Sequence, residues 1–200
     1  MTSSTRALRA DAARNREALL AAAEEVFAER GVEASVADIA RRAGVAKGTV
    51  FRHFASKEDL IASLVCEHLV TLTDALHGLA DARDPGAALL EFLTIAADQR
   101  RQHDLTYLQK YSANDARVIA IRDAVHAGVA TLVANARAAG AIRADVTGTD
   151  VFLLMCAPVH VMDGHPEPPP DLWRRYLAII FDGLRPEGAS PLPLPAPELP

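Results

Sequence analysis

The stretch "GVAKGTVFRHF", residues 44–54, sets basic, hydroxyl and glycine positions around a few apolar ones. In a helix that turns about 100° per residue, Val50 and Phe54 fall on one side, and Val45 comes just before them. We expect these three side chains to pack against the preceding helix. The other side, with Phe51 at its border, consists of Lys47, Gly48, Thr49, Arg52 and His53.

A short helix precedes this stretch, over "SVADIARRAG". Ser35 and Asp38 have the spacing of a capping box, and Gly44 is a typical helix stop. Two short helices joined through a glycine are typical of a helix-turn-helix, whose second helix enters the major groove of DNA. From Ser35 to Lys57 the chain has five basic residues and one acid, although the whole protein has a net charge of -5. A DNA-binding face is one interpretation of this charge, and a solvated helix face without a ligand is the alternative.

Individual side chains of this segment suit different parts of DNA. Lys47 and Thr49 can donate to base edges in the groove, and Phe51 can contact a thymine methyl group. Gly48 has no side chain and allows the backbone to approach DNA closely. Lys57 follows Ser56, the N-cap signal at the start of "SKED", residues 56–59. The free amides of a helix N-terminus favour an anion such as a phosphate.

The composition predicts an all-α protein, because half of the 200 residues are hydrophobic and only 5% are aromatic. Apolar periodicity predicts a helix over residues 17–29, beginning as early as Asp11, and a long helix from Leu60. After Pro85 it predicts further helices over residues 86–102, 104–112, 115–139, 150–164 and 171–184. We expect Thr149 to cap the fourth of these and Pro158 to kink it.

These patterns divide the chain into four parts. We predict a flexible arm over residues 1–12, a DNA-binding domain over 13–72 with its helix-turn-helix at 35–54, a helical regulatory and dimerisation domain over 73–185, and a disordered proline-rich tail over 186–200. The long helix joins the two domains.

Several function classes are not expected. No nucleophile stands with a base, so we predict neither an enzyme nor a cofactor. The motif "HVMDGH", residues 160–165, contains ligand types for a metal but lacks a further ligand at matching spacing, so we predict no metal site. The N-terminus lacks the apolar core of a signal peptide, and the longest apolar run, residues 151–159, is too short to span a bilayer. We therefore expect a cytoplasmic protein.

Residues 17–65 strongly resemble the N-terminal domain of TetR-type (tetracycline-repressor-like) transcriptional regulators. The resemblance rests on "FAERG", "IARRAGVAKGTVFRHF" and "KEDL", and it extends loosely to "GAIRADVTGTDVFLLM" and "WRRYLAIIFDGLRP". It implies a homodimer with one helix-turn-helix per subunit, which binds a near-palindromic DNA operator and leaves it when a small molecule enters the C-terminal helical domain.

The resemblance also implies roles for single residues. Ser35 would cap the first helix and contact a phosphate, while His53 and Lys57 would contact other backbone phosphates. The groove would receive Lys47, Gly48, Thr49 and Phe51.

The chain departs from the family pattern at three points. Phe51 stands where the family commonly has tyrosine, so a hydroxyl contact to phosphate is lost. Ala46 replaces a frequent serine at the start of the second helix, which removes a capping oxygen. The loop from Gly31 to Ile39 is one residue shorter than the usual form.

For the C-terminal half, the resemblance implies a ligand cavity within residues 86–165. Its candidate walls, for each of which ordinary core is the alternative, are Phe92, Tyr107, Phe152, Met155 and Met162. The apolar helices over 150–162 and 172–184 are the predicted dimer surface, forming a four-helix bundle with their copies as in the family. The candidate interface residues are Leu172, Leu177, Ile180, Phe181 and Leu184.

The function predicted from the sequence is a sequence-specific DNA-binding transcriptional regulator, a homodimeric repressor that a small molecule releases from its operator. Two alternatives remain open at this point. One is a helical regulator that responds to a protein partner, and the other is a ligand-binding protein without specific DNA recognition.

Overall fold

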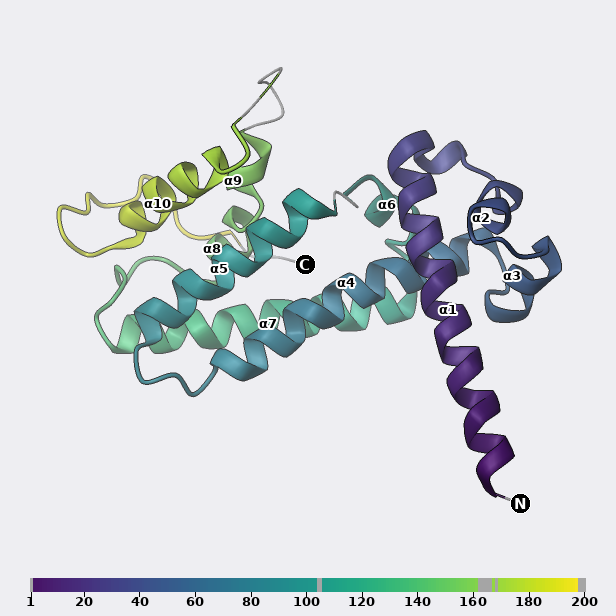
Figure 1. The fold of residues 1–200 in the computed structure, drawn as a ribbon. Coiled ribbons are helices and arrows are strands. Elements are labelled where there is room, and N and C mark those ends of the chain that lie inside the picture. Colours follow the sequence, from purple (N-terminus) through teal and green to yellow (C-terminus); the bar gives the residue numbers. More distant parts are fainter. Residues whose placement is uncertain (1, 104–105, 162–166, 168, 198–200) are drawn as a thin grey trace. The chain divides into compact units, whose positions relative to one another are not determined.

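The structure, a computed structural model, describes residues 2–103, 106–161, 167 and 169–197, and every regular element in these residues is a helix (Figure 1). The predicted all-α fold is therefore confirmed. The elements are α1 (Thr2–Arg30), the 3-10 helix η1 (Gly31–Glu33), α2 (Val36–Arg42), α3 (Lys47–His53), α4 (Lys57–Leu79), α5 (Pro85–Gln102), α6 (Thr106–Tyr111), α7 (Ala116–Ala138), α8 (Gly148–Leu154), α9 (Ala157–His160) and α10 (Leu172–Leu184).

The helices form two compact units. The first unit comprises Met1–His68 and Asp104–Ile119, and the second comprises Leu69–His103 and Ala120–Pro200. The boundary inside α4 lies close to the predicted division between residues 72 and 73. The grouping of 104–119 with the first unit was not predicted, and it follows from the packing of α6 against η1.

The first unit is built on α1, which packs against α2, while α2 packs against α3. The first residues of the chain, predicted as a flexible arm, are part of α1, because this helix begins at Thr2 rather than near Asp11. The apolar stripe that the sequence predicts on α1 is buried, together with apolar side chains of the following helices. Buried members of this core are Leu19, Leu20, Ala23, Val26, Phe27, Ile39, Ala40, Val50, Phe54, Leu60, Ile61, Leu64 and Val65.

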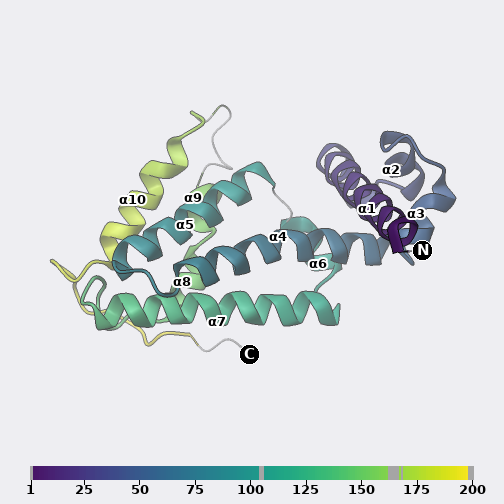
Figure 2. The same cartoon turned by 60° about the horizontal axis from the view of Figure 1, so that its bottom comes forward.

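The second unit surrounds a separate apolar core. The second half of α4 runs beside α7 in both views, and α10 packs on α5 and α9 (Figures 1 and 2). A Cβ atom on Gly148 would stand 2.6 Å from the Cα atom of Ala130, so only glycine lets α8 start directly against α7. Large side chains of this core are Leu72, Leu76, Leu89, Phe92, Leu93, Val125, Val129, Leu132, Val133, Trp173, Leu177 and Phe181.

The helix predicted over residues 150–164 is divided in two within its described part. It is interrupted after Leu154 and resumes with α9, where Pro158 occupies the first turn. The predicted cap Thr149 is wrong, since Thr147 occupies that position. The Thr147 hydroxyl accepts a hydrogen bond from the Asp150 backbone N–H, and the Asp150 carboxylate accepts one from the Thr147 N–H at 2.7 Å. This reciprocal pair fixes the start of α8 two residues earlier than expected.

The proline-rich tail has no helix or strand between residues 185 and 197. It nevertheless makes defined contacts with the second unit. The backbone N–H of Arg143 donates to the Leu184 carbonyl at 2.8 Å, and the Arg143 guanidinium donates to the Ser190 carbonyl. The chain after α10 is thus held at its start by the loop that precedes α8.

Helices α4 and α7 are long and apolar enough to cross a bilayer by length and composition. Part of each apolar surface packs inside the protein. Leu72 and Leu76 from α4 and Val129 and Leu132 from α7 belong to the core of the second unit. We therefore interpret both as core helices.

Candidate nucleic-acid interface

The turn between α2 and α3 follows the predicted helix-turn-helix plan. Gly44 adopts a φ of 68°, which favours glycine, and the backbone N–H of Val45 donates to the Ala40 carbonyl at 2.9 Å. Val50 and Phe54 are each 1% exposed, as the helical spacing predicted. The prediction for Val45 is wrong, because its side chain is 37% exposed and does not join the core between the helices.

The outward side of α3 presents a mixed set of side chains. Lys47, Gly48, Phe51 and Arg52 are exposed, whereas Thr49 and His53 are half-buried. The Phe51 ring is 45% exposed, and the Lys47 ammonium lies 5.7 Å from its centroid. Apolar and cationic groups therefore lie together on the surface of one short helix.

The basic side chains of α2 are engaged within the protein. Arg42 bridges two carboxylates of α1, with Nη1 at 2.7 Å from Glu25 and Nη2 at 2.6 Å from Glu29. Arg41 lies 2.6 Å from Asp38, which also pairs with Arg30 at 2.8 Å.

The same α2 side chains line a small hollow on the first unit. Its volume is about 260 Å³, and its lining consists of Val26, Arg30, Asp38, Arg41 and Arg42. Because Asp38 pairs with two of these arginines and Arg42 pairs with α1, the positive charge of this hollow is largely compensated.

Ser35 performs the capping role predicted for it. Its hydroxyl accepts from the Asp38 backbone N–H at 3.2 Å, and its own backbone N–H donates to the Asp38 carboxylate at 3.0 Å. The Ser35 hydroxyl also donates to that carboxylate at 2.6 Å. These bonds, together with Arg41, hold the pKa of Asp38 well below its usual range. The Ser35 side chain is exposed, which leaves it accessible from solvent.

Lys57 has a structural contact that the sequence did not predict. Its ammonium donates a hydrogen bond to the Val32 carbonyl of η1. The predicted cap of α4 is present beside it, because the Ser56 hydroxyl accepts from the Asp59 backbone N–H at 3.1 Å. Lys57 thus stands at a helix N-terminus, as expected, while also connecting α4 to η1.

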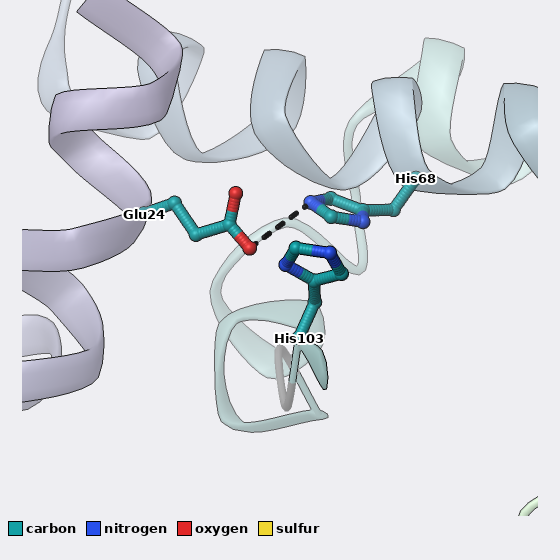
Figure 3. Close-up of side chains that lie close together, drawn as sticks. All are labelled: Glu24, His68 and His103. Atoms are coloured by element: carbon teal, nitrogen blue, oxygen red, sulfur yellow. Dashed lines mark ion pairs between the residues drawn. The ribbon is translucent and has the colours of Figure 1, made fainter. Parts of the chain in front are cut away.

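Two further contacts of α1 within the first unit were not found from the sequence. The Arg16 guanidinium stacks over the Phe54 ring, 4.6 Å from its centroid. Figure 3 shows Glu24 of α1 and His68 of α4 pointing toward each other, with 3.6 Å between the carboxylate oxygen and Nε2. Both contacts join residues more than a helix apart in the sequence, so no local pattern indicates them.

Of the residues predicted to line a ligand cavity, three are in or against the core of the second unit. Phe92 and Met155 are buried in the core of the second unit, and Phe152 packs against that core. The His126 ring lies edge-on to Phe152 at 5.2 Å. Tyr107 belongs to α6, but its side chain lies outside the described part of the structure, as does all of Met162.

The predicted dimer residues of α10 lie mainly inside the protein. Leu177, Phe181 and Leu184 are between 4% and 6% exposed and belong to the core of the second unit, so they do not form an interface face. Leu172 and Ile180 are half-buried. The exposed apolar side chains of this region are Leu153, Leu154, Val161 and Ile179.

One buried polar group of the second unit, the indole N–H of Trp173, has no hydrogen-bond partner among the described residues. Trp173 itself is fully buried. Nearby helices carry a polar contact, in which the Arg100 guanidinium lies 3.0 Å from Nε2 of His160. His160 is the one potential ligand of the "HVMDGH" motif that lies in the described part of the chain, since Asp163 and His165 fall outside it.

The comparisons with known proteins agree with this geometry. The profile of bacterial regulatory proteins of the TetR family matches residues 19–64, and the profile of the C-terminal domain of SbtR-like transcriptional regulators matches residues 84–186. A crystal structure of the TetR transcription regulatory protein from Mycobacterium vanbaalenii is 31% identical, with a TM-score of 0.62, over 89% of this chain and 99% of that one.

Curated relatives match about a third of this chain. The HTH-type transcriptional repressor BepR of Brucella suis is 46% identical over 61 residues, which are 30% of this chain and 29% of BepR. The HTH-type transcriptional repressor Rv3405c of Mycobacterium tuberculosis is 51% identical over 67 residues, 32% of this chain and 35% of that protein. The chain thus matches about a third of the length of these relatives. All of these relatives are transcription regulators, which agrees with the expectation that the chain is not an enzyme.

Proposed function

Since the chain belongs to the TetR family of transcriptional regulators, we propose that it is a homodimeric repressor that binds operator DNA through α3 and leaves it when a small molecule binds. The observation that carries this proposal is a contrast between the basic side chains of α3 and those of α2. Lys47 and Arg52 on α3 form no ion pair with any acidic side chain in the described part of the chain, whereas Arg41 and Arg42 on α2 do. Unpaired cations on an exposed helix are available to DNA.

Within this proposal the side chains of α3 divide the contacts to DNA. Lys47, Gly48, Thr49 and Phe51 enter the major groove, while Ser35, His53 and Lys57 contact phosphates. Arg52 is exposed beside them and adds a positive charge that suits either partner. The half-buried position of Thr49 and His53 limits how far their side chains extend from α3.

Dimerisation is proposed through the exposed apolar side chains of α8 and α10. Leu153 is 52% exposed, Leu154 is 37% and Ile179 is 54%, and an apolar face of this kind favours a partner surface of the same kind. A second copy of the chain supplies that surface by symmetry, and a two-fold dimer binds a near-palindromic operator. A DNA-binding regulator of this bacterial family acts in the cytoplasm, where we assign the protein.

The effector is proposed to bind in the second unit. The support is Trp173, whose buried indole N–H has no acceptor among the described residues. Such a group costs about 1–3 kcal/mol, and a ligand oxygen would relieve that cost. Differential binding to the state with low operator affinity then releases the DNA.

The DNA-binding proposal is tested by selecting duplexes from a random-sequence pool with the purified full-length protein. Affinity for the enriched duplex and for a scrambled duplex is then measured over a range of salt concentrations. We expect a steep salt dependence and a preference for the enriched duplex of about a thousandfold or more. Equal affinity for both duplexes would contradict a sequence-specific repressor.

The effector proposal uses the fact that the chain has one tryptophan. Compounds from a metabolite panel that raise the melting temperature are titrated against the intrinsic fluorescence of Trp173. We expect a compound that releases the enriched duplex to shift this emission, and we expect Trp173→Phe, which keeps an aromatic ring but loses the N–H, to bind it more weakly. Release of DNA by a compound that leaves both emission and the Trp173→Phe affinity unchanged would remove Trp173 from the effector site.

A further inference from the structure

The first turn of α7 is joined to the start of α4 by one arginine. Nη2 of Arg117 lies 2.8 Å from an oxygen of Asp59 on α4 and 2.8 Å from an oxygen of Asp115. Its Nε donates to the second oxygen of Asp115 at 3.0 Å, so Arg117 and Asp115 form a bidentate pair. All three residues belong to the first unit. A fork of this kind holds the guanidinium in one orientation, which a single exposed ion pair does not.

The second oxygen of Asp59 has a different partner. It accepts a hydrogen bond at 2.8 Å from the backbone N–H of Ala55, the residue that follows the C-cap of α3. That C-cap, Phe54, is 1% exposed and anchors α3 in the core. The Asp59 carboxylate therefore connects Arg117 of α7 with the turn that follows α3, the helix proposed to contact DNA.

We propose that Arg117 is a positioning residue for DNA binding, which acts through Asp59 to fix the turn between α3 and α4. The proposal rests on the proposed function, because it assumes that α3 contacts the operator. Val50 and Phe54 hold one face of α3, but the direction in which α3 leaves the core depends on the turn that follows it. Fixing Ala55 removes alternative orientations of α3 before DNA is bound, and such ordering lowers the cost of binding.

The test compares the full-length wild type with Arg117→Gln, which loses the charge and the fork. Arg122→Gln is the matched control, because it makes the same change on the same helix at an arginine without an ion pair in the described structure. Affinity is measured for the duplex that the wild type enriches from the random pool. We expect Arg117→Gln to bind it roughly threefold to tenfold more weakly, and Arg122→Gln to bind as the wild type does.

A second readout follows the turn itself. Hydrogen exchange of the Ala55 amide should become at least about tenfold faster in Arg117→Gln, while the Phe54 amide, which donates to Val50 inside α3, keeps its protection. A purely stabilising role would instead accelerate exchange throughout the unit. Arg117→Lys, which keeps the charge without the fork, should show an intermediate effect and replaces Arg117→Gln if that variant does not fold.

The two hypotheses fail in different ways. If the wild type enriches no sequence, the proposed function is wrong, and the Ala55 exchange still decides whether Arg117 holds the turn. Wild-type operator affinity in Arg117→Gln, or unchanged exchange at Ala55, would overturn the positioning role.

Discussion

Helices α2 and α3 are both seven residues long, but their positive charges have different partners. Arg41 and Arg42 stand in the last turn of α2, whereas α3 has Lys47 at its first residue and Arg52 in its last turn. Arg41 and Arg42 of α2 are paired with carboxylates of α1 and α2. The Lys47 ammonium of α3 lies over the ring of Phe51 and has no ion pair with an acid of the described chain, and α3 has no acidic residue in its first turn. Positive charge on α2 thus stabilises the unit, whereas positive charge on α3 remains available to a partner.

This difference corrects a simple count of charge. Five basic residues between Ser35 and Lys57 suggest one basic face, but two of them pair with acids and Lys57 donates to a backbone carbonyl. Arg42 pairs with Glu25 and Glu29, which lie on α1, outside residues 35–57. The charge available for DNA is therefore concentrated on α3.

The largest effect is expected from Lys47→Ala. Loss of a side chain that contacts bases should lower affinity for the enriched duplex by about tenfold to a hundredfold and relax the preference at one base position. The melting temperature should stay the same, since Lys47 makes no ion pair in the described chain. Binding to single-base variants of the duplex measures the preference.

Arg42→Ala tests whether α2 and α3 differ in their contribution to DNA recognition. Because Arg42 bridges Glu25 and Glu29, its loss should lower the melting temperature by a few degrees at most and leave base preference intact. Lys110→Ala, at an exposed lysine of α6, controls for the loss of charge alone. A change of base preference in Arg42→Ala that equals that of Lys47→Ala would remove the distinction between α2 and α3.

Lys57→Ala should have the next largest effect, and it should affect two properties. Loss of the bond to the Val32 carbonyl lowers the melting temperature. Loss of the proposed phosphate contact weakens binding to all duplexes alike and reduces the salt slope by about 1. A lower melting temperature with an unchanged salt slope would show that Lys57 serves only to connect α4 to η1.

The sequence predicted the helices of this protein well because apolar periodicity reflects burial directly. Val50 and Phe54 are buried as expected. Val45 is exposed because it precedes the first residue of α3 and lies in the turn, where helical spacing no longer describes side-chain direction. The rule held for Val50 and for the C-cap Phe54, and it failed two residues before the helix begins.

The same rule explains why three of the predicted dimer residues, Leu177, Phe181 and Leu184, lie in the core of this chain. Periodicity on α10 identifies its most apolar stripe, and that stripe, with Leu177 and Phe181, packs into the protein's own core. An exposed apolar residue such as Ile179, which we propose for the dimer surface, lies off the stripe and is recognised only once burial within one chain is known. Contacts such as Arg117 with Asp59 depend on residues 58 positions apart, and no local pattern contains that information.

A smaller effect is expected from Phe51→Tyr. The added hydroxyl can donate to a phosphate, so affinity should rise by a few fold for enriched and scrambled duplexes alike. The ring is 45% exposed, which leaves room for the hydroxyl without disturbing the core. Phe51→Leu keeps an apolar side chain without the ring and serves as the control. A gain restricted to the enriched duplex would mean that the added hydroxyl contacts a base rather than the backbone.

The smallest effect is expected on stability at low pH. It separates Arg117, which pairs with carboxylates, from Lys47, which has no ion pair in the described chain. The Arg117 guanidinium is the main cause that lowers the pKa of Asp115 from its ordinary value of 3.8 to about 2. The unfolded chain therefore takes up this proton at a higher pH than the folded one, so protonation favours unfolding as the pH falls. The stabilisation is complete above about pH 4 and is lost as the pH falls toward 2.

Denaturant unfolding of the wild type and of Arg117→Gln between about pH 5 and pH 2 measures this contribution as the difference between their midpoints. The difference should be constant above about pH 4 and shrink below it, because acids that do not contact Arg117 contribute equally to both proteins. Lys47→Ala should unfold in parallel with the wild type at every pH, since Lys47 has no carboxylate partner in the described chain. A pH-dependent gap between Lys47→Ala and the wild type would mean that α3 also uses its charge within the protein, and the contrast with α2 would then be lost.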